Sequence, residues 1–125
     1  MRKYLFGLVL LFALDQSAIV FADSIESKVE QHGTSKYLEI LGVNSKVTDH
    51  LLTIHLQIKN KDNNDNRGYY RVRWLDESGD LVWDEEAWKP LLLHGNQKMI
   101  LKLVAPTIKA KDFKIEFSAE ENYRE

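Results

Sequence analysis

The chain contains no cysteine, and this absence removes several structural and chemical options at once. It excludes disulfide bonds, so an exported form must rely on its hydrophobic core for stability. It excludes the lipid anchor that bacterial lipoproteins carry on a cysteine at the cleavage site. It also excludes a thiol nucleophile and every zinc site that uses thiolate ligands. A single domain of 125 residues buries about two thirds of its chain surface, which is enough to fold without these supports.

An excess of charge of one sign is also lacking. The chain has 17 lysines and arginines against 19 aspartates and glutamates, a net charge of −2. A nucleic-acid-binding domain needs a clustered basic face, and attraction to anionic lipid needs basic residues in excess. The composition therefore predicts no nucleic-acid partner and no stable membrane insertion once a signal segment has been removed.

Motifs for catalysis and for metal binding are absent. There is no Gly-x-Ser-x-Gly sequence and no cysteine to act as a nucleophile. The four histidines form no pair at the i,i+2 or i,i+4 spacing of common metal sites: His32, His50, His55 and His94. Acid pairs such as Glu85 and Glu86 lack the buried setting that acid–base catalysis requires. We therefore predict no catalytic residue, no metal and no cofactor, and an enzyme is the least favoured function class.

Two acidic loops have oxygen-bearing side chains at alternating positions, as calcium loops do. In the loop that starts at Asp76, the glycine comes too early and Glu86 stands at the eleventh position, where a calcium loop needs a glutamate at the twelfth. In the loop that starts at Asp62, Arg67 occupies the position that requires glycine. Turns made of Asp, Asn, Ser and Gly explain both loops without an ion.

The first two dozen residues have the layout of a secretory signal peptide. Two basic residues stand near the start, an uncharged apolar run covers 5–14, and Val20 and Ala22 place small residues at the −3 and −1 positions before Asp23. The apolar run is too short to span a bilayer. We predict a cleaved signal peptide over 1–22 and a periplasmic mature protein. The alternative is a retained interfacial anchor, which Asp15 disfavours because it interrupts the apolar run early.

The remaining sequence has the periodicity of a β-protein. Residues 52–58 alternate strictly between apolar and polar, so one face of this strand should be buried. No long amphipathic helix is found. Further short strands are expected at 36–43, 68–76, 80–84, 91–93, 98–105 and 112–118. This pattern predicts an all-β, immunoglobulin-like antiparallel β-sandwich of about seven strands, with a polar leader over 23–35, the sandwich over 36–118 and a charged tail over 119–125.

The stretch around Trp74 can be assigned to two faces by its alternation. If Trp74 points inward as a core pillar, Tyr69, Arg71 and Arg73 point outward. They would share a solvated face, or a binding face, with His55 if the strands at 52–58 and 68–76 belong to one sheet. The predicted core consists of Ile54, Leu56, Ile58, Tyr70, Val72, Trp74, Phe113 and Ile115.

Between Gln57 and Phe117 the sequence resembles the YcfL-type family of small Gram-negative envelope proteins, a domain family of unknown function. The resemblance rests on these residues: Asn60, Tyr70-Arg71 through Trp74-Leu75-Asp76, Gly79, Trp88, and Ala105-Pro106 before Asp112-Phe113. It implies a periplasmic, immunoglobulin-like sandwich and supplies no catalytic residues. Many members look like lipoproteins, and the absence of cysteine sets this chain apart from them.

Two binding functions are compatible with these features. The first is a non-catalytic periplasmic module that binds another envelope protein, through a sheet face or through strand addition at a sheet edge. The second is a domain that binds a small ligand or a cell-wall fragment in a pocket near Trp83 and Trp88.

Overall fold

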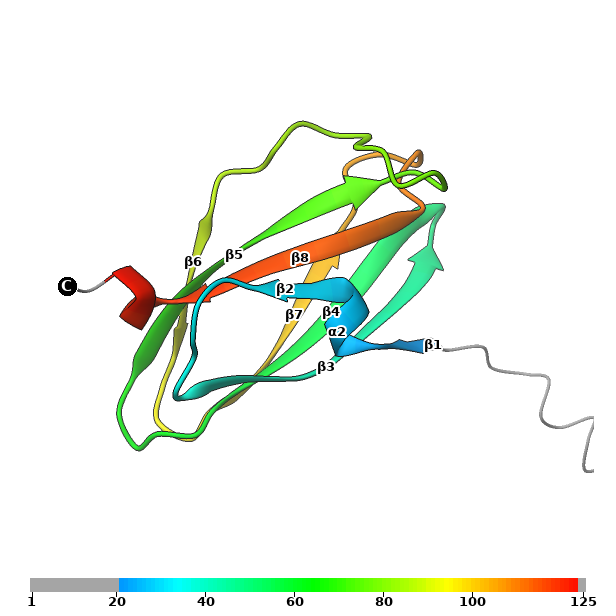
Figure 1. Cartoon of the computed structure of the whole chain (residues 1–125). Coiled ribbons are helices and arrows are strands. Elements are labelled where there is room, and N and C mark those ends of the chain that lie inside the picture. Colours follow the sequence, from blue (N-terminus) through cyan, green and yellow to red (C-terminus); the bar gives the residue numbers. More distant parts are fainter. Residues whose placement is uncertain (1–20, 124–125) are drawn as a thin grey trace, which may run out of the picture.

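The structure is a computed structural model that describes residues 21–123, and it consists of two four-stranded β-sheets packed face to face (Figure 1). One sheet has the order β1-β3-β4-β7 and contains β1 (Phe21–Asp23), β3 (Leu38–Thr48), β4 (Leu51–Asn60) and β7 (Lys98–Val104). The other has the order β2-β8-β5-β6 and contains β2 (Val29–Gln31), β8 (Asp112–Ala119), β5 (Asn66–Leu75) and β6 (Lys89–Leu93). Two single helical turns complete the described residues, α2 (Ile25–Lys28) and η1 (Glu120–Tyr123). The predicted all-β sandwich is confirmed.

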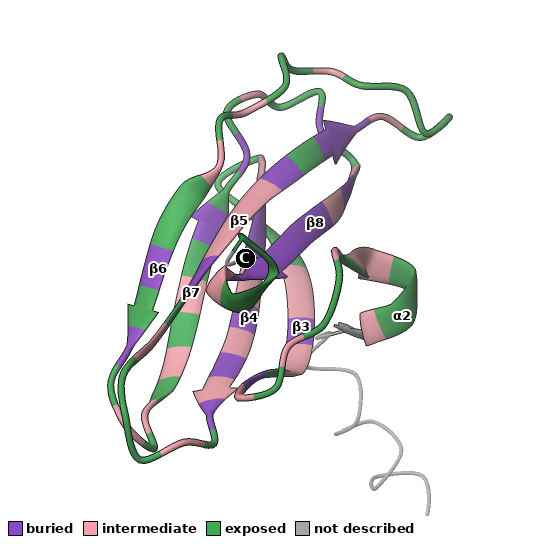
Figure 2. Ribbon diagram, turned by 60° about the vertical axis from the view of Figure 1, so that its left-hand side comes forward, coloured by how far each residue is buried: buried purple, intermediate pink, exposed green. Residues whose placement is uncertain are grey.

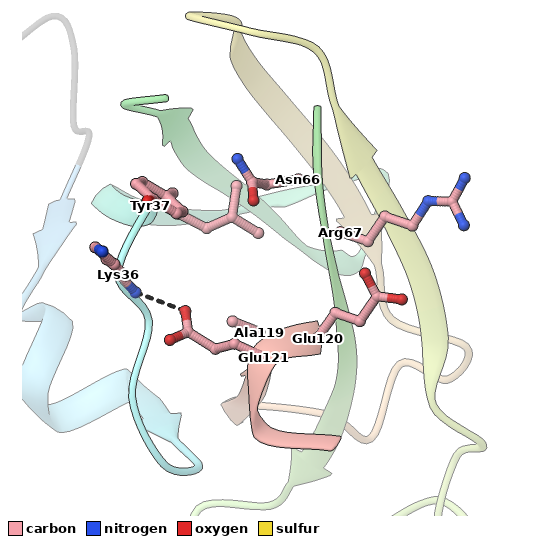
Figure 3. A pocket seen from close by; sticks show the side chains of 8 residues that line it. Lys36, Tyr37, Asn66, Arg67, Ala119, Glu120 and Glu121 are labelled. Atoms are coloured by element: carbon pink, nitrogen blue, oxygen red, sulfur yellow. Dashed lines mark hydrogen bonds between the residues drawn. The ribbon is translucent and has the colours of Figure 1, made fainter. Parts of the chain in front are cut away.

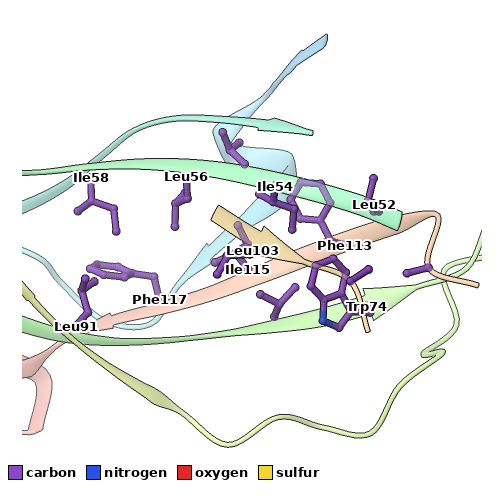
Figure 4. Packing of buried hydrophobic residues seen from close by; sticks show 14 of the residues in the cluster. Leu52, Ile54, Leu56, Ile58, Trp74, Leu91, Leu103, Phe113, Ile115 and Phe117 are labelled. Carbon is purple, nitrogen blue, oxygen red and sulfur yellow. The ribbon is translucent and has the colours of Figure 1, made fainter. Parts of the chain in front are cut away.

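The core lies between the sheets, where β4 faces β5 and β8 (Figure 4). Four alternating apolar residues of β4 are buried, namely Leu52, Ile54, Leu56 and Ile58. They meet the aromatic and aliphatic side chains of the opposite sheet, which include Trp74, Phe113, Ile115 and Phe117. Of the eight predicted core residues, seven are buried and Tyr70 is half-buried against the others. Burial of each large apolar side chain contributes about 1.5–3 kcal/mol, so this layer is the main source of stability.

The prediction of a strand at 80–84 is wrong, because no strand lies between β5 and β6. After the turn that follows Asp76, the chain makes one isolated bridge, between Leu81 and Leu75, and Val82 donates one backbone hydrogen bond to Trp74. It then leaves the sheet. Leu81 and Trp83 are both exposed, and only Val82 packs against the core, so the segment has too little buried surface to hold it as a strand.

The polar leader predicted over 23–35 contributes to the sandwich. Val29–Gln31 forms β2, which pairs with β8 in parallel, Val29 opposite Ile115. The sandwich is therefore not wholly antiparallel. Ile25 and Val29 also pack against the core. A strand of three residues has no periodicity that could be recognised in the sequence.

The loop between β4 and β5 carries the chain from one sheet to the other and is organised by Asn60. This side chain is fully buried. Its Nδ2 donates to the carbonyl oxygens of Asn64, at 2.8 Å, and of His94, at 3.0 Å. Its Oδ1 accepts a hydrogen bond from the backbone N–H of Asp62. Because the chain crosses here, β4 and β5 lie in different sheets, and the predicted face that joined His55 to Tyr69, Arg71 and Arg73 is wrong.

The predicted signal peptide over 1–22 falls almost entirely on residues 1–20, which lie outside the described residues. Within 21–123, no helix has the length and apolar character needed to cross a lipid bilayer.

Candidate functional site

Arg71 lies at the centre of the outer face of the β2-β8-β5-β6 sheet. It is opposite Glu116 in the register of β5 and β8. The two side chains form a bidentate ion pair, with Arg71 Nε 2.7 Å from Oε2 and Nη2 3.3 Å from Oε1 of Glu116. Arg71 Nη1 also lies 2.8 Å from a carboxylate oxygen of Glu85. Only 19% of the Arg71 side chain and 7% of the Glu116 side chain are exposed, so this pair is largely withdrawn from solvent.

Two ring side chains cover this ion pair. The guanidinium carbon of Arg71 lies 4.6 Å from the centroid of the Trp88 ring, a cation–π distance. The ring of His32 meets Trp88 edge-on, with centroids 5.6 Å apart. His32 Nε2 also lies 3.0 Å from Glu116 Oε1. We call His32, Arg71, Trp88 and Glu116 the Arg71 cluster. Its members come from the leader, from β5, from the segment before β6 and from β8, so the cluster ties four parts of the chain together.

The ion pair determines the protonation of both partners. Burial opposes ionisation of Glu116, but the hydrogen bonds and charges of Arg71 and His32 outweigh it, and the pKa of Glu116 lies below its ordinary value. The hydrogen bond to Glu116 raises the pKa of Arg71. Both groups are therefore charged at neutral pH, and neither is poised to exchange a proton with a substrate.

Glu30, His32 and Glu116 bring three potential ligand atoms within 4.8 Å of one another. The same Glu116 carboxylate already binds the guanidinium of Arg71. A divalent cation would compete with that positive group for the same oxygens and would lie close to it. The donor set is therefore poorly suited to a metal ion.

Beside the Arg71 cluster lies a cavity of about 350 Å³ that is lined by Tyr69, Trp88 and Tyr123, here called the aromatic cavity. The rings of Tyr69 and Tyr123 meet edge-on with centroids 5.6 Å apart. Tyr69 also borders a second cavity of about 340 Å³ along β5 and β6, whose lining includes Pro90 and Leu92. The two cavities together form an open apolar surface beside the edge strand β6.

A further cavity, of about 210 Å³, lies at the end of the sandwich where η1 meets the start of β3 and of β5 (Figure 3). The backbone N–H of Lys36 donates to Glu121 across it, at 2.7 Å. Close by, Asn122 Nδ2 donates to the carbonyl oxygens of His32 and Thr34. These contacts attach η1 to the leader, and so they hold Tyr123 and His32 in the positions described above. Of the tail predicted over 119–125, Ala119 ends β8 and residues 120–123 form η1.

The predicted pocket near Trp83 and Trp88 is not formed by both residues. Trp88 packs on Arg71, whereas Trp83 is exposed and borders a separate cavity with Leu81 and Lys109. Of the predicted binding face, Tyr69 lines the aromatic cavity and Arg73 is exposed beside the Arg71 cluster.

Three residues of the site were missed by sequence reasoning, namely His32, Glu116 and Tyr123. The alternation of Phe113, Ile115 and Phe117 places Glu116 on the outer face, so its position was recognisable. His32 and Tyr123 reach the site only through the packing of the leader and of η1.

The acidic turn after β5 is stabilised by its own hydrogen bonds. Asp76 Oδ1 accepts the backbone N–H groups of Ser78, at 2.8 Å, and of Asp80, at 3.0 Å. Gly79 takes a positive φ of 87°, which glycine adopts without strain. The carboxylate of Asp76 therefore serves as a turn acceptor.

Comparison with known proteins identifies a family and a fold. The family model described as "Protein of unknown function (DUF1425)" matches residues 24–119. The crystal structure of Campylobacter jejuni cj0090 is similar, with a TM-score of 0.64 and 21% identity over 74% of this chain and 97% of that chain. A DUF1425 family member from Shewanella sp. pv-4 has a TM-score of 0.59 and 24% identity over 82% of this chain and 90% of that chain. At these identities the likeness shows the fold alone. A search of curated proteins finds no match.

Proposed function

The chain belongs to the DUF1425 family of proteins of unknown function, and we propose that it is a non-catalytic periplasmic module that binds another envelope protein. Its contact surface in this proposal is the aromatic cavity of Tyr69, Trp88 and Tyr123. We also propose that it is a YcfL-type member of the family, which the residues from Asn60 to Phe113 support.

The observation that carries the proposal is the convergence of three aromatic side chains from three separate segments on one apolar cavity. Tyrosine and tryptophan are the residues that most often dominate the binding energy of protein interfaces. Trp88 is held between Arg71 and His32, so little side-chain entropy is lost when a partner contacts it.

The polar groups beside the cavity support a role without catalysis. Arg71, Glu116 and His32 are already hydrogen-bonded to one another. A catalytic site needs groups that are free to act on a substrate, with a nucleophile or a base near a reacting atom. In the Arg71 cluster, the contacts of Arg71 and His32 instead hold the Trp88 ring in a fixed position.

A second candidate is the binding of a small ligand or a cell-wall fragment. The volume of the aromatic cavity, about 350 Å³, lies at the low end of the range for small-molecule pockets. Its ring faces would pack against the apolar faces of a sugar or of an aliphatic group.

The experiment that tests the site is affinity capture from the envelope fraction with matched variants. Tyr123→Ala removes an exposed ring of the cavity, and Trp83→Ala removes an exposed ring elsewhere. We expect the partner to be captured by the wild type and by Trp83→Ala and to be lost with Tyr123→Ala. Equal capture by both variants would show that the aromatic cavity is not the contact surface. If no protein is captured but muropeptides quench the tryptophan fluorescence of the wild type, the second candidate replaces the first.

The periplasmic location has a separate test. Intact-mass analysis of the periplasmic fraction should find a chain that begins at Asp23. Recovery of the full-length chain from the cytosol would contradict the predicted export and the periplasmic role with it.

A further inference from the structure

The outer face of the β1-β3-β4-β7 sheet has an ordered arrangement of side chains. The register places Glu39, Lys59 and Lys98 in one row across β3, β4 and β7. Two rows further along the strands, the register aligns Asn44, His55 and Lys102. The neighbours of these residues along β4 point into the core, which fixes this side of the sheet as the outer one.

The strands that form this face carry a strong charge bias. β3, β4 and β7 contain four lysines and one glutamate, Glu39. The lysines are Lys46, Lys59, Lys98 and Lys102, and all are exposed except Lys59, which is half-buried. Within residues 21–123, Glu39 pairs with Lys61, and none of the four lysines has a carboxylate within ion-pair distance. The whole chain is nearly neutral, so the fold has separated its charges and left this face basic.

Exposed aliphatic side chains alternate with the lysines on the edge strand β7. Ile100 stands between Lys98 and Lys102 and is 64% exposed, and Val104 follows at 47%. Figure 2 shows exposed positions recurring along β7. Such a pattern is unfavourable in water, because two β-branched side chains remain solvated beside charged ones. The cavities described above all lie elsewhere on the molecule, so this face is suited to a broad partner.

We propose that the outer face of β3, β4 and β7 binds the surface of an anionic lipid bilayer. Lysines at such a surface pair with lipid phosphates while their alkyl chains lie along the interface. Ile100 and Val104, on the same face, would enter the boundary between headgroups and acyl chains. An acidic protein would match the charges and would cover the aliphatic groups only if its own contact surface placed apolar side chains opposite Ile100 and Val104. The bilayer surface offers phosphates to the lysines and an apolar boundary to Ile100 and Val104.

This surface is independent of the aromatic cavity, which lies on the opposite sheet. A chain that rests on a membrane through β3, β4 and β7 would present Tyr69, Trp88 and Tyr123 away from the lipid. Peripheral binding of this kind requires no inserted segment and no lipid anchor.

The test is flotation of the chain 23–125 with two kinds of vesicle, phosphatidylcholine alone and phosphatidylcholine mixed with phosphatidylglycerol. We expect binding to the anionic vesicles only, and we expect it to weaken as salt is added because salt screens exposed charges. Each lysine near an anionic surface contributes about 1 kcal/mol, or roughly fivefold in affinity. The double variant Lys98→Gln with Lys102→Gln should therefore bind about 25-fold more weakly.

The matched control is Arg73→Gln with Lys114→Gln, which makes the same change in net charge on the other sheet. It should bind anionic vesicles like the wild type. Equal loss in both double variants would show a general charge effect and would overturn the assignment to this face. No binding to anionic vesicles, or equal binding to neutral ones, would overturn the lipid proposal, and the basic face would then be tested against acidic proteins.

Discussion

The indole Nε1 of Trp74 donates a hydrogen bond to Glu86 Oε2, at 3.3 Å, from within the core layer of β5. The other oxygen of the same carboxylate accepts the backbone N–H of Val72, at 3.2 Å. The pairing of β6 with β5 begins at Lys89, opposite Tyr70, so Val72 lies beyond the end of β6. Glu86 thus accepts the backbone hydrogen bond of Val72 that a longer β6 would accept. The same carboxylate also accepts the hydrogen bond of the buried Trp74 indole.

Replacement of Glu86 should therefore destabilise the fold although most residues of the segment around it are exposed. Glu86→Ala leaves the N–H groups of Trp74 and Val72 without their acceptor, and we expect the free energy of unfolding to fall by about 1–3 kcal/mol. Urea denaturation followed by tryptophan fluorescence measures this change. Glu77→Ala, at an exposed position of the preceding turn, is the control and should change stability by less than about 0.5 kcal/mol. Equal effects of the two substitutions would contradict the role of Glu86.

Trp74 should be among the largest single contributors to stability. Its side chain is 2% exposed and packs within the core cluster, so Trp74→Ala should cost about 3–5 kcal/mol. That is a large part of the roughly 5–15 kcal/mol that stabilises such a domain. Arg73→Ala, one residue earlier and exposed on the other face, should cost far less. The comparison needs only the denaturation midpoints of the two variants, and similar midpoints would show that the assignment of faces in β5 is wrong.

The ion pair of Glu116 should make stability depend on pH in the acidic range. The pKa of Glu116 in the folded state lies below its ordinary value of 4.5. Its contribution is therefore fully present above about pH 4.5 and is lost as the pH falls through the folded-state pKa. The free energy of unfolding of the wild type should decrease in this range more steeply than that of Glu116→Gln, which has no carboxyl group to titrate at this position. Parallel pH profiles for the two proteins would show that Glu116 has the same pKa in the folded and unfolded states.

Arg71 and Arg73 should respond differently to charge reversal although both face outward. Arg71→Glu places a second carboxylate against the largely buried Glu116, and loss of such a pair costs about 3–5 kcal/mol. Arg73→Glu changes an exposed side chain and should move the thermal midpoint little. Thermal melting of the two single variants checks this difference. If Arg71→Glu melts like the wild type, the ion pair does not support the fold. Binding experiments should use Arg73→Glu alone, because loss of binding with Arg71→Glu could result from unfolding.

Alternation along single strands was sufficient to predict much of the core. In β4 the apolar residues at every second position from 52 to 58 are buried, and in β5 the inward position of Trp74 fixes the outward positions of Arg71 and Arg73. These features depend only on the geometry of an extended chain, in which successive side chains point to opposite sides. The same alternation in β8 places Glu116 outside. The segment 80–84 has strand-forming residues, but only Val82 among them packs against the core, and there local propensity led to a wrong prediction.

The assembly of the site was decided by tertiary structure. The chain passes from one sheet to the other after Asn60, so β4 and β5 belong to different sheets. This passage separates His55, on β4, from Arg71, on β5. The leader reaches Glu116 through a parallel pairing with β8 across more than 80 residues of sequence. The sequence by itself determined which side of each strand is buried, because that choice is local. Only the packing of distant segments decided which outward residues became neighbours, because many pairings of short strands satisfy the same alternation.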